Sequence, residues 1–244
     1  MRSSVIAAAT SLLLLLLGSA QAAEIKVMYP PPLRTLLSEL IPQFEQASGH
    51  KLVVTYESSW LLVERIRKGE TADVAFLTAR QADDLIKEGK LARRVELLSS
   101  SIGLAVRAGE PKPDIGSVEA FKRTLLAAKS FARNEGADSG IFMTGLLERL
   151  GLTDAMKPKT TLVRQGFVAA LVAKGEVEMA AQQMPELMAV AGVDATPLPA
   201  EIQHRIVFCA VLLPQVPDAV SALIAFLSSP AAVSVIRSKG LAPM

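Results

Sequence analysis

The chain has 244 residues, with 26 lysines and arginines against 24 aspartates and glutamates, so its formal net charge is +2. This balance excludes a basic nucleic-acid surface as the main function, and no basic run with interleaved aromatic residues occurs. The length suits one large domain or two smaller lobes. Cys209 is the only cysteine, so it cannot form a disulfide within the chain, and its apolar surroundings predict a buried core residue.

The first 22 residues have the pattern of a cleavable export signal. Arg2 supplies positive charge, residues 5–17 are almost wholly apolar, and Ala20-Gln21-Ala22 has the small-x-small pattern that signal peptidase reads. The apolar run is shorter than the ~20 residues that a membrane span needs, which argues against an anchor. We therefore predict a signal peptide at residues 1–22 and an exported mature chain.

The next segment of the chain alternates predicted strands with predicted helices. Between Leu33 and Ala47, apolar residues recur at three- and four-residue spacing, which predicts a helix with one buried face that ends at Gly49. Pro42 is expected to kink or divide this helix. The alternation is typical of a parallel sheet with crossover helices. The other elements expected here are strands at 24–28, 52–56 and 72–77, and helices at 60–68 and from 78 or 79 to 88.

The remaining elements are shorter. After the polar break at Ser99-Ser100-Ser101, an apolar stretch at 102–106 predicts a strand that leaves the first group of elements. Pro185 suits the first turn of a helix. The other expected strands are at 130–133, 161–163, 177–182 and 206–213, and the expected helices are at 118–128, 141–150, 167–173, 219–227 and 231–239.

Three turns follow predicted strands and lead into helices: Tyr29 to Pro32, Glu57 to Ser59, and Gly136 to Gly140. In open parallel sheets the ligand crevice lies beyond the carboxyl ends of the strands. Backbone N–H groups at helix starts lack intrahelical partners there, and the helix dipole favours negative charge. Serine hydroxyls in the second and third turns add donors, although serines are also ordinary helix caps. We therefore expect the three turns to meet at a site for a small anion.

Several segments, by their order and spacing, resemble one family over essentially the whole mature chain. These segments are residues 25–27, 40–45 with Gly49, 69–74, 139–140 with 147–151, 172–176 and 225–232. The chain resembles the molybdate-binding-protein-like branch of the type II periplasmic substrate-binding proteins of ABC transporters. The resemblance implies a periplasmic location. It also implies the α/β, two-lobed periplasmic binding protein type II fold, in which each lobe is a mainly parallel sheet flanked by helices. Two hinge crossings are expected near 101–106 and 207–212, with lobe 1 at 23–103 plus 209–244 and lobe 2 at 104–208.

The same resemblance bears on the ligand. Molybdate binders of this family use a serine in the first loop and a tyrosine after a later strand, whereas this chain has Pro31 and Pro32 in the first loop and Gln182-Gln183 near the tyrosine region. These differences argue against molybdate and tungstate. A Gln-Gln-x-x-Glu segment ending at Glu186 and the segment 197–203 are closer to a sister branch that resembles binders of organic carboxylates. That branch is similar to a periplasmic aconitate isomerase.

We expect a solute-binding protein with a small anionic ligand, an ABC transporter permease of the inner membrane as partner, and a monomeric state. The candidate ligand-binding residues are Tyr29, Pro31, Pro32, Arg34, Ser58, Ser59, Trp60, Arg80, Ser139, Gly140 and Gln183. The arginines and Gln183 suit a carboxylate, but each also fits a solvated surface residue, and Trp60 fits a cleft wall or the core.

No catalytic residue, metal site or cofactor is predicted. The two histidines lack partners at metal-ligand spacing, and no phosphate-binding glycine motif occurs. The alternative function is an isomerase on the same fold, for which Glu57 or Asp138 is a candidate general base. A ligand-binding sensor module is a third possibility with the same fold.

Overall fold

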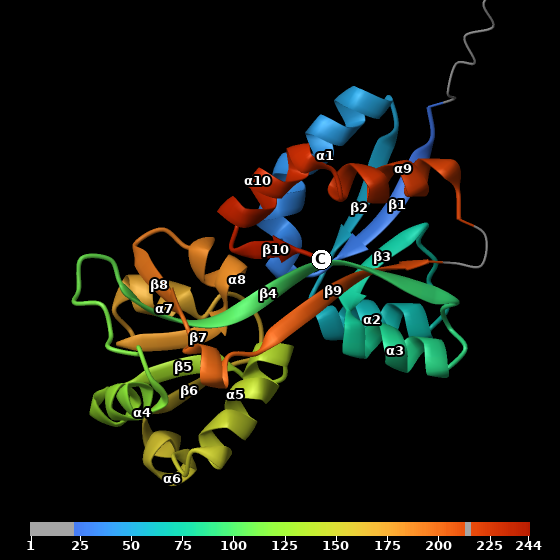
Figure 1. The fold of residues 1–244 in the computed structure, drawn as a ribbon. Coiled ribbons are helices and arrows are strands. Elements are labelled where there is room, and N and C mark those ends of the chain that lie inside the picture. The colour runs from blue at the N-terminus through green and yellow to red at the C-terminus, as the bar shows by residue number, and fades with distance from the viewer. Residues whose placement is uncertain (1–21, 213–215) are drawn as a thin grey trace, which may run out of the picture.

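The computed structural model describes residues 22–212 and 216–244. The predicted signal peptide therefore lies, apart from Ala22, outside the described residues. Figure 1 shows two α/β lobes joined by the long strands β4 (Arg93–Arg107) and β9 (Arg205–Leu212), and the two-lobed fold expected from the sequence is confirmed. The lobe boundaries drawn at residues 103 and 209 stay a prediction.

In the first lobe the predicted alternation is confirmed. Strands β2, β1 and β3 lie side by side in parallel, and β9 continues the sheet antiparallel to β3. The elements are β1 (Glu24–Tyr29), η1 (Pro31–Leu33), α1 (Arg34–Ser48), β2 (Lys51–Tyr56), α2 (Ser59–Arg67), β3 (Val74–Thr78) and α3 (Ala79–Lys87). Thr78 and Gln81 form a reciprocal capping box that fixes the start of α3.

Two sequence expectations in this region need correction. Helix α1 runs through Pro42 to Ser48, so the division expected at Pro42 is wrong, while a kink there stays a prediction. Gly49 with φ of 75° ends the helix as predicted. Strand β4 does not begin after a break at Ser99-Ser100-Ser101, because it runs through these serines from Arg93. Ser99 and Ser100 are buried and paired with β9 on one side and with β10 (Leu241–Pro243) on the other, so tertiary pairing overrides the low strand propensity of serine.

The second lobe is built on the far half of β4. Residues 102–107 of β4 pair antiparallel with β7 and β8, and β7, β5 and β6 follow in parallel. Neither β8 nor β10 was predicted from the sequence. The elements are α4 (Val118–Ala127), β5 (Phe131–Asn134), α5 (Asp138–Arg149), α6 (Thr153–Met156), η2 (Lys157–Lys159), β6 (Thr160–Val163), α7 (Ala169–Lys174), β7 (Met179–Gln183), α8 (Met184–Met188), β8 (Val193–Pro197) and η3 (Ala200–Ile202).

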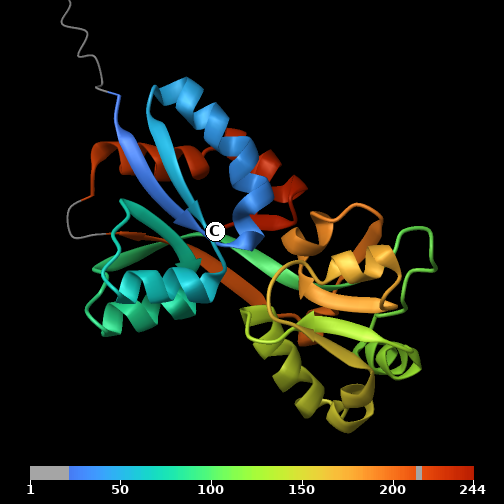
Figure 2. The same cartoon turned by 180° about the vertical axis from the view of Figure 1, so that it is seen from behind.

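Helices cover both faces of each sheet. In the first lobe α1 packs with α9 (Asp218–Leu227) and α10 (Pro230–Ser238) on one face, and α2 and α3 lie on the other (Figure 2). Phe44, Phe76 and Phe208 fill this core, and Cys209 is fully buried as predicted. Among the described residues, no single helix is long and apolar enough to span a membrane; α9 and α10, with a 61° bend between them, meet the test only as a pair.

Candidate functional site

A cleft of about 980 Å³ lies between the lobes and brings the three predicted turns together. Its lining includes Pro31 and Pro32 from the first turn, Ser58 and Ser59 from the second, and residues 136–138 from the third. The turns meet because each follows the carboxyl end of a strand, β1, β2 or β5, as expected for parallel sheets. Of the other predicted residues, Trp60, Arg80 and Gln183 also line the cleft.

Four predicted residues do not line the cleft. Tyr29 is buried and packs against Tyr56 with ring centroids 5.6 Å apart, while the guanidinium carbon of Arg34 lies 5.2 Å from the centre of the Tyr56 ring. These contacts, made by the residues on either side of Pro31 and Pro32, hold the first turn in place. Ser139 and Gly140 are buried within the first turn of α5. Contact of these four residues with a ligand stays a prediction.

The second turn does not use its serines as helix caps. Ser58 occupies the cap position of α2, yet its side chain makes no capping hydrogen bond and its buried Oγ has no partner among the described residues. Ser59 is the first residue of the helix. Trp60 is 54 % exposed and lines the cleft, so the core role expected for it is wrong.

Helix α5 begins three residues earlier than expected. The sequence analysis placed its start at residue 141, but the helix starts at Asp138 and its N-terminal cap residue is Ala137. This is possible because Gly140 packs directly against the backbone carbonyl of Asn134, which only a residue without Cβ allows. Asn134, at the end of β5, is buried and lines the cleft.

The charged groups of the cleft are already paired. Arg80 of α3 reaches across to α5, where its Nη2 lies 2.6 Å from Oδ1 of Asp138. Arg164 pairs with Glu135 at 3.1 Å. Asp138 is therefore neutralised by a cation from the opposite lobe, although a carboxylate beside an anion site would otherwise repel the ligand. The Arg80 side chain is 58 % exposed, so an incoming anion can reach its guanidinium and compete with Asp138 for it.

Glu186 was part of a sequence motif but was not assigned to the site. It is 5 % exposed, lines the cleft, and accepts a hydrogen bond on Oε1 from Nε2 of Gln182 at 2.8 Å. Burial raises the pKa of Glu186 to about 8, and hydrogen bonds from the Gln183 backbone and the Gln182 side chain oppose this shift. The carboxyl is therefore mainly in its acid form at neutral pH.

Buried polar atoms without a hydrogen-bond partner gather at this cleft. Among the described residues, such atoms include Ser58 Oγ, Asn134 Oδ1 and Glu186 Oε2, which all belong to the lining, and Ser139 Oγ next to it. Buried polar groups in folded proteins are nearly always paired. A polar ligand between the lobes would satisfy groups from both of them.

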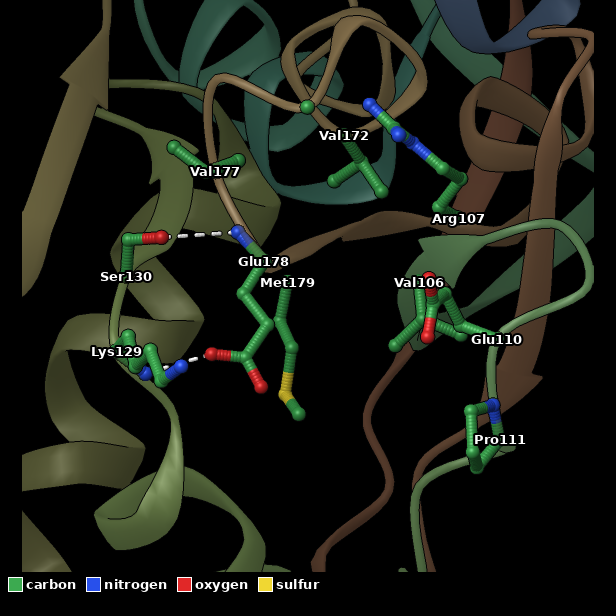
Figure 3. Close-up of a pocket in the computed structure, with 11 residues that line it drawn as sticks. Val106, Arg107, Glu110, Pro111, Lys129, Ser130, Val172, Val177, Glu178 and Met179 are labelled. Carbon is green, nitrogen blue, oxygen red and sulfur yellow. Dashed lines mark hydrogen bonds between the residues drawn. The ribbon is translucent and has the colours of Figure 1, made fainter.

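A second cavity of about 550 Å³ lies on the second lobe, away from the cleft (Figure 3). Two hydrogen bonds join its polar groups: Glu178 accepts from the backbone N–H of Lys129, and its own N–H donates to Ser130 Oγ. None of the buried atoms without a partner in the described part of the chain belongs to its lining. In the same part of the chain, no group of three or more His, Cys, Asp or Glu side chains is placed to hold a metal ion.

Comparison with known proteins decides the family. Residues 25–242 match the family model described as bacterial extracellular solute-binding protein. The chain belongs to this family. It is similar to an aconitate isomerase from a Pseudomonas species, with 32 % identity over 94 % of this chain and 96 % of that protein. It is also similar to the molybdate-binding protein ModA of Azotobacter vinelandii, with 28 % identity over 93 % and 92 % of the two chains.

Solved structures show the same fold. The periplasmic molybdate-binding protein of Azotobacter vinelandii superposes with a TM-score of 0.72 at 20 % identity, covering 89 % of this chain and 98 % of that one. The resemblance to the molybdate-binding-protein-like family stated from the sequence is therefore confirmed, as is the periplasmic binding protein type II fold.

Proposed function

We propose that this solute-binding protein is exported to the periplasm, captures a small organic carboxylate in the interlobe cleft and delivers it as a monomer to an ABC transporter permease. The observation that carries the proposal is the set of unpartnered polar atoms on Ser58, Asn134 and Glu186, three residues that line one cleft from two lobes. A ligand that bridges them favours closure, because closure supplies contacts that the open form lacks.

The chemistry of the lining favours a carboxylate over a tetrahedral oxyanion. Pro31 and Pro32 stand in the first turn and offer no N–H donors to surround an oxyanion. The planar fork of Arg80 matches a carboxylate, and the exposed face of Trp60 suits a carbon skeleton. The similarity to an aconitate isomerase, whose substrate carries several carboxylates, supports the same ligand class.

A thermal-shift screen tests this proposal. Di- and tricarboxylates, phosphorylated acids, molybdate and tungstate are added to the purified chain, and we expect one carboxylate to raise the Tm by about 5 to 10 °C at about 100 times its Kd. The Ser58→Ala variant should bind that carboxylate about tenfold more weakly, since it loses a hydrogen bond to a charged group. Ser221→Ala, at an exposed serine of α9, is the matched control. A response to molybdate without a response to any carboxylate would refute the proposal.

Two observations favour an isomerase as the second candidate. The first is the similarity to the aconitate isomerase over nearly the whole chain, and the second is Glu186, a buried carboxyl that holds its proton near neutral pH. A proton shift next to a carboxylate needs such a general acid or base. Of the bases proposed from the sequence, Asp138 is paired with Arg80, and Glu57 is not part of the cleft lining.

Proton NMR separates the two candidates. The chain is mixed with cis- or trans-aconitate, and the ratio of the double-bond isomers is followed over time. For a binder we expect the ratio to stay constant while the Tm rises. Conversion of more than one equivalent of substrate, abolished in Glu186→Gln, would establish the isomerase instead.

A further inference from the structure

The Gln182 side chain has a fixed orientation beside Glu186. Its Oε1 accepts a hydrogen bond from the backbone N–H of Val168 at 3.0 Å. The side-chain atom that faces this N–H must be the amide oxygen, because the amide NH2 group cannot accept a hydrogen bond. Its Nε2 therefore faces the other way and donates to the carbonyl of Gly166 at 3.2 Å and to Glu186 Oε1 at 2.8 Å. Since an amide N–H needs an acceptor, Oε1 of Glu186 is the unprotonated oxygen of this carboxyl.

The proton of the acid form therefore belongs on Oε2. This atom is buried and has no hydrogen-bond partner among residues 22–212 and 216–244, and its residue lines the cleft. Gln182 thus places the O–H group on the unpartnered oxygen of a residue that lines the cleft. An unpaired buried hydroxyl is costly, whereas a short hydrogen bond from it to a carboxylate is among the stronger ones that proteins form.

No cation compensates Glu186 in the described part of the chain. The charged groups near α8 or facing it across the cleft include Arg107 on β4, Asp194 on β8, Arg34 after η1, and Glu64, Arg67, Arg80, Asp84, Glu135, Asp138 and Arg164 of the cleft lining. Arg80 and Arg164 are paired with Asp138 and Glu135, Arg67 is paired with Glu64 and Glu88, and none of these groups forms an ion pair with Glu186. Ionisation of Glu186 would place an uncompensated negative charge beside a bound anion.

We infer that Glu186 is the specificity-determining hydrogen-bond donor of the cleft, which keeps its proton on Oε2 and donates it to a carboxylate oxygen of the bound solute. The inference rests on the proposed function and adds a condition to it: the ligand binds the acid form of Glu186. The affinity for the anion therefore changes with pH in one direction: it is higher at low pH and falls as the Glu186 carboxyl ionises. Gln182 acts as the positioning residue for this proton.

The pH dependence of binding tests the inference. Calorimetric titrations with trans-aconitate and citrate are made between about pH 7 and pH 9.5, where the carboxyls of the probes are ionised. Above a pKa of about 8 the competent fraction of native protein falls, so its Kd should rise about tenfold per pH unit. In Glu186→Gln the amide still accepts from Gln182 and still presents a donor, but it cannot titrate. Its Kd should therefore stay constant over the same range.

Controls separate the possible failures. Glu176→Gln, at an exposed carboxyl of the same lobe paired only with Lys174, should keep the native pH slope. A native Kd that is independent of pH, or an equal slope in native protein and Glu186→Gln, overturns the inference and leaves carboxylate binding intact. Absence of binding of every carboxylate to native protein overturns the proposed function itself. If Glu186→Gln does not fold, proton uptake by native protein decides, with about one proton per bound probe expected at pH ~9 and none overturning the inference.

Discussion

Replacement of Gly140 by alanine is expected to lower the Tm of the chain by about 6 to 12 °C, corresponding to a loss of about 3 kcal/mol. A Cβ at this position would lie 2.7 Å from the carbonyl carbon of Asn134 and closer still to its oxygen. Both clashing atoms belong to the backbone, so β5 and the start of α5 must move apart. That movement displaces Asn134 and Asp138, both of which line the cleft, so carboxylate binding should weaken as well.

Gly145 provides the matched control in the same helix. A Cβ there meets only the end of the flexible Arg149 side chain at 3.6 Å. Gly145→Ala should therefore raise the free energy of unfolding by up to about 1 kcal/mol, because alanine favours the helical conformation. Thermal unfolding of both variants, followed by circular dichroism, measures the difference. Equal Tm values for the two variants would show that α5 has no close contact at Gly140.

Periodic patterns in the sequence predicted most of the fold. The stripe from Leu33 to Ala47 and the alternation of short apolar strands with helices identify the parallel sheet of the first lobe, because local burial creates both patterns. Ser99 and Ser100 carried no such signal. Their strand exists because β9 and β10 pair with their backbone on both sides, and those partners lie more than 100 residues away in the chain. The same dependence on distant partners hides β8 and β10.

The candidate site was predictable only in outline. Turns at the carboxyl ends of parallel strands must share one edge, so the meeting of Pro31, Ser58 and Asp138 follows from topology. Asn134 and Glu186 were missed because their importance lies in buried atoms without partners, a property of the surrounding structure. The Gln-Gln-x-x-Glu segment carried a usable signal: Gln182 and Glu186 meet because four residues separate them across the start of α8.

The pairing of Arg80 with Asp138 connects the chemistry of the cleft to the motion of the lobes. This ion pair joins α3 of one lobe to α5 of the other, so any separation of the lobes breaks it. An anion bound between the lobes competes with Asp138 for the same guanidinium. On the proposed function, the net charge offered to the ligand is consequently small, and hydrogen-bond donors such as Ser58 and Glu186 determine which ligand binds.

A second glutamine fixes the point at which β4 passes from one lobe to the other. Residues up to Ser101 pair with β9, whereas Ile102 and the residues that follow pair with β7 and β8. At this junction the side-chain amide of Gln203 forms hydrogen bonds with backbone groups, as a peptide group of a neighbouring strand would. Its Oε1 accepts from the N–H of Ile102 at 2.9 Å, and its Nε2 donates to the carbonyls of Ile102 at 3.0 Å and Leu198 at 3.2 Å.

Gln203→Ala is therefore expected to destabilise the chain by about 2 kcal/mol, or about 4 to 8 °C in Tm, because the buried N–H of Ile102 loses its partner. Differential scanning calorimetry measures the loss. Gln43→Ala, at an exposed position of α1, removes the same side chain without such contacts and should leave the Tm unchanged or slightly higher. Hydrogen exchange adds a local readout: the amide of Ile102 should exchange faster in Gln203→Ala, while amides in β1 keep their protection. An unchanged rate of hydrogen exchange at the Ile102 amide would show that the Gln203 side chain is not needed to fix β4 where it passes between the lobes.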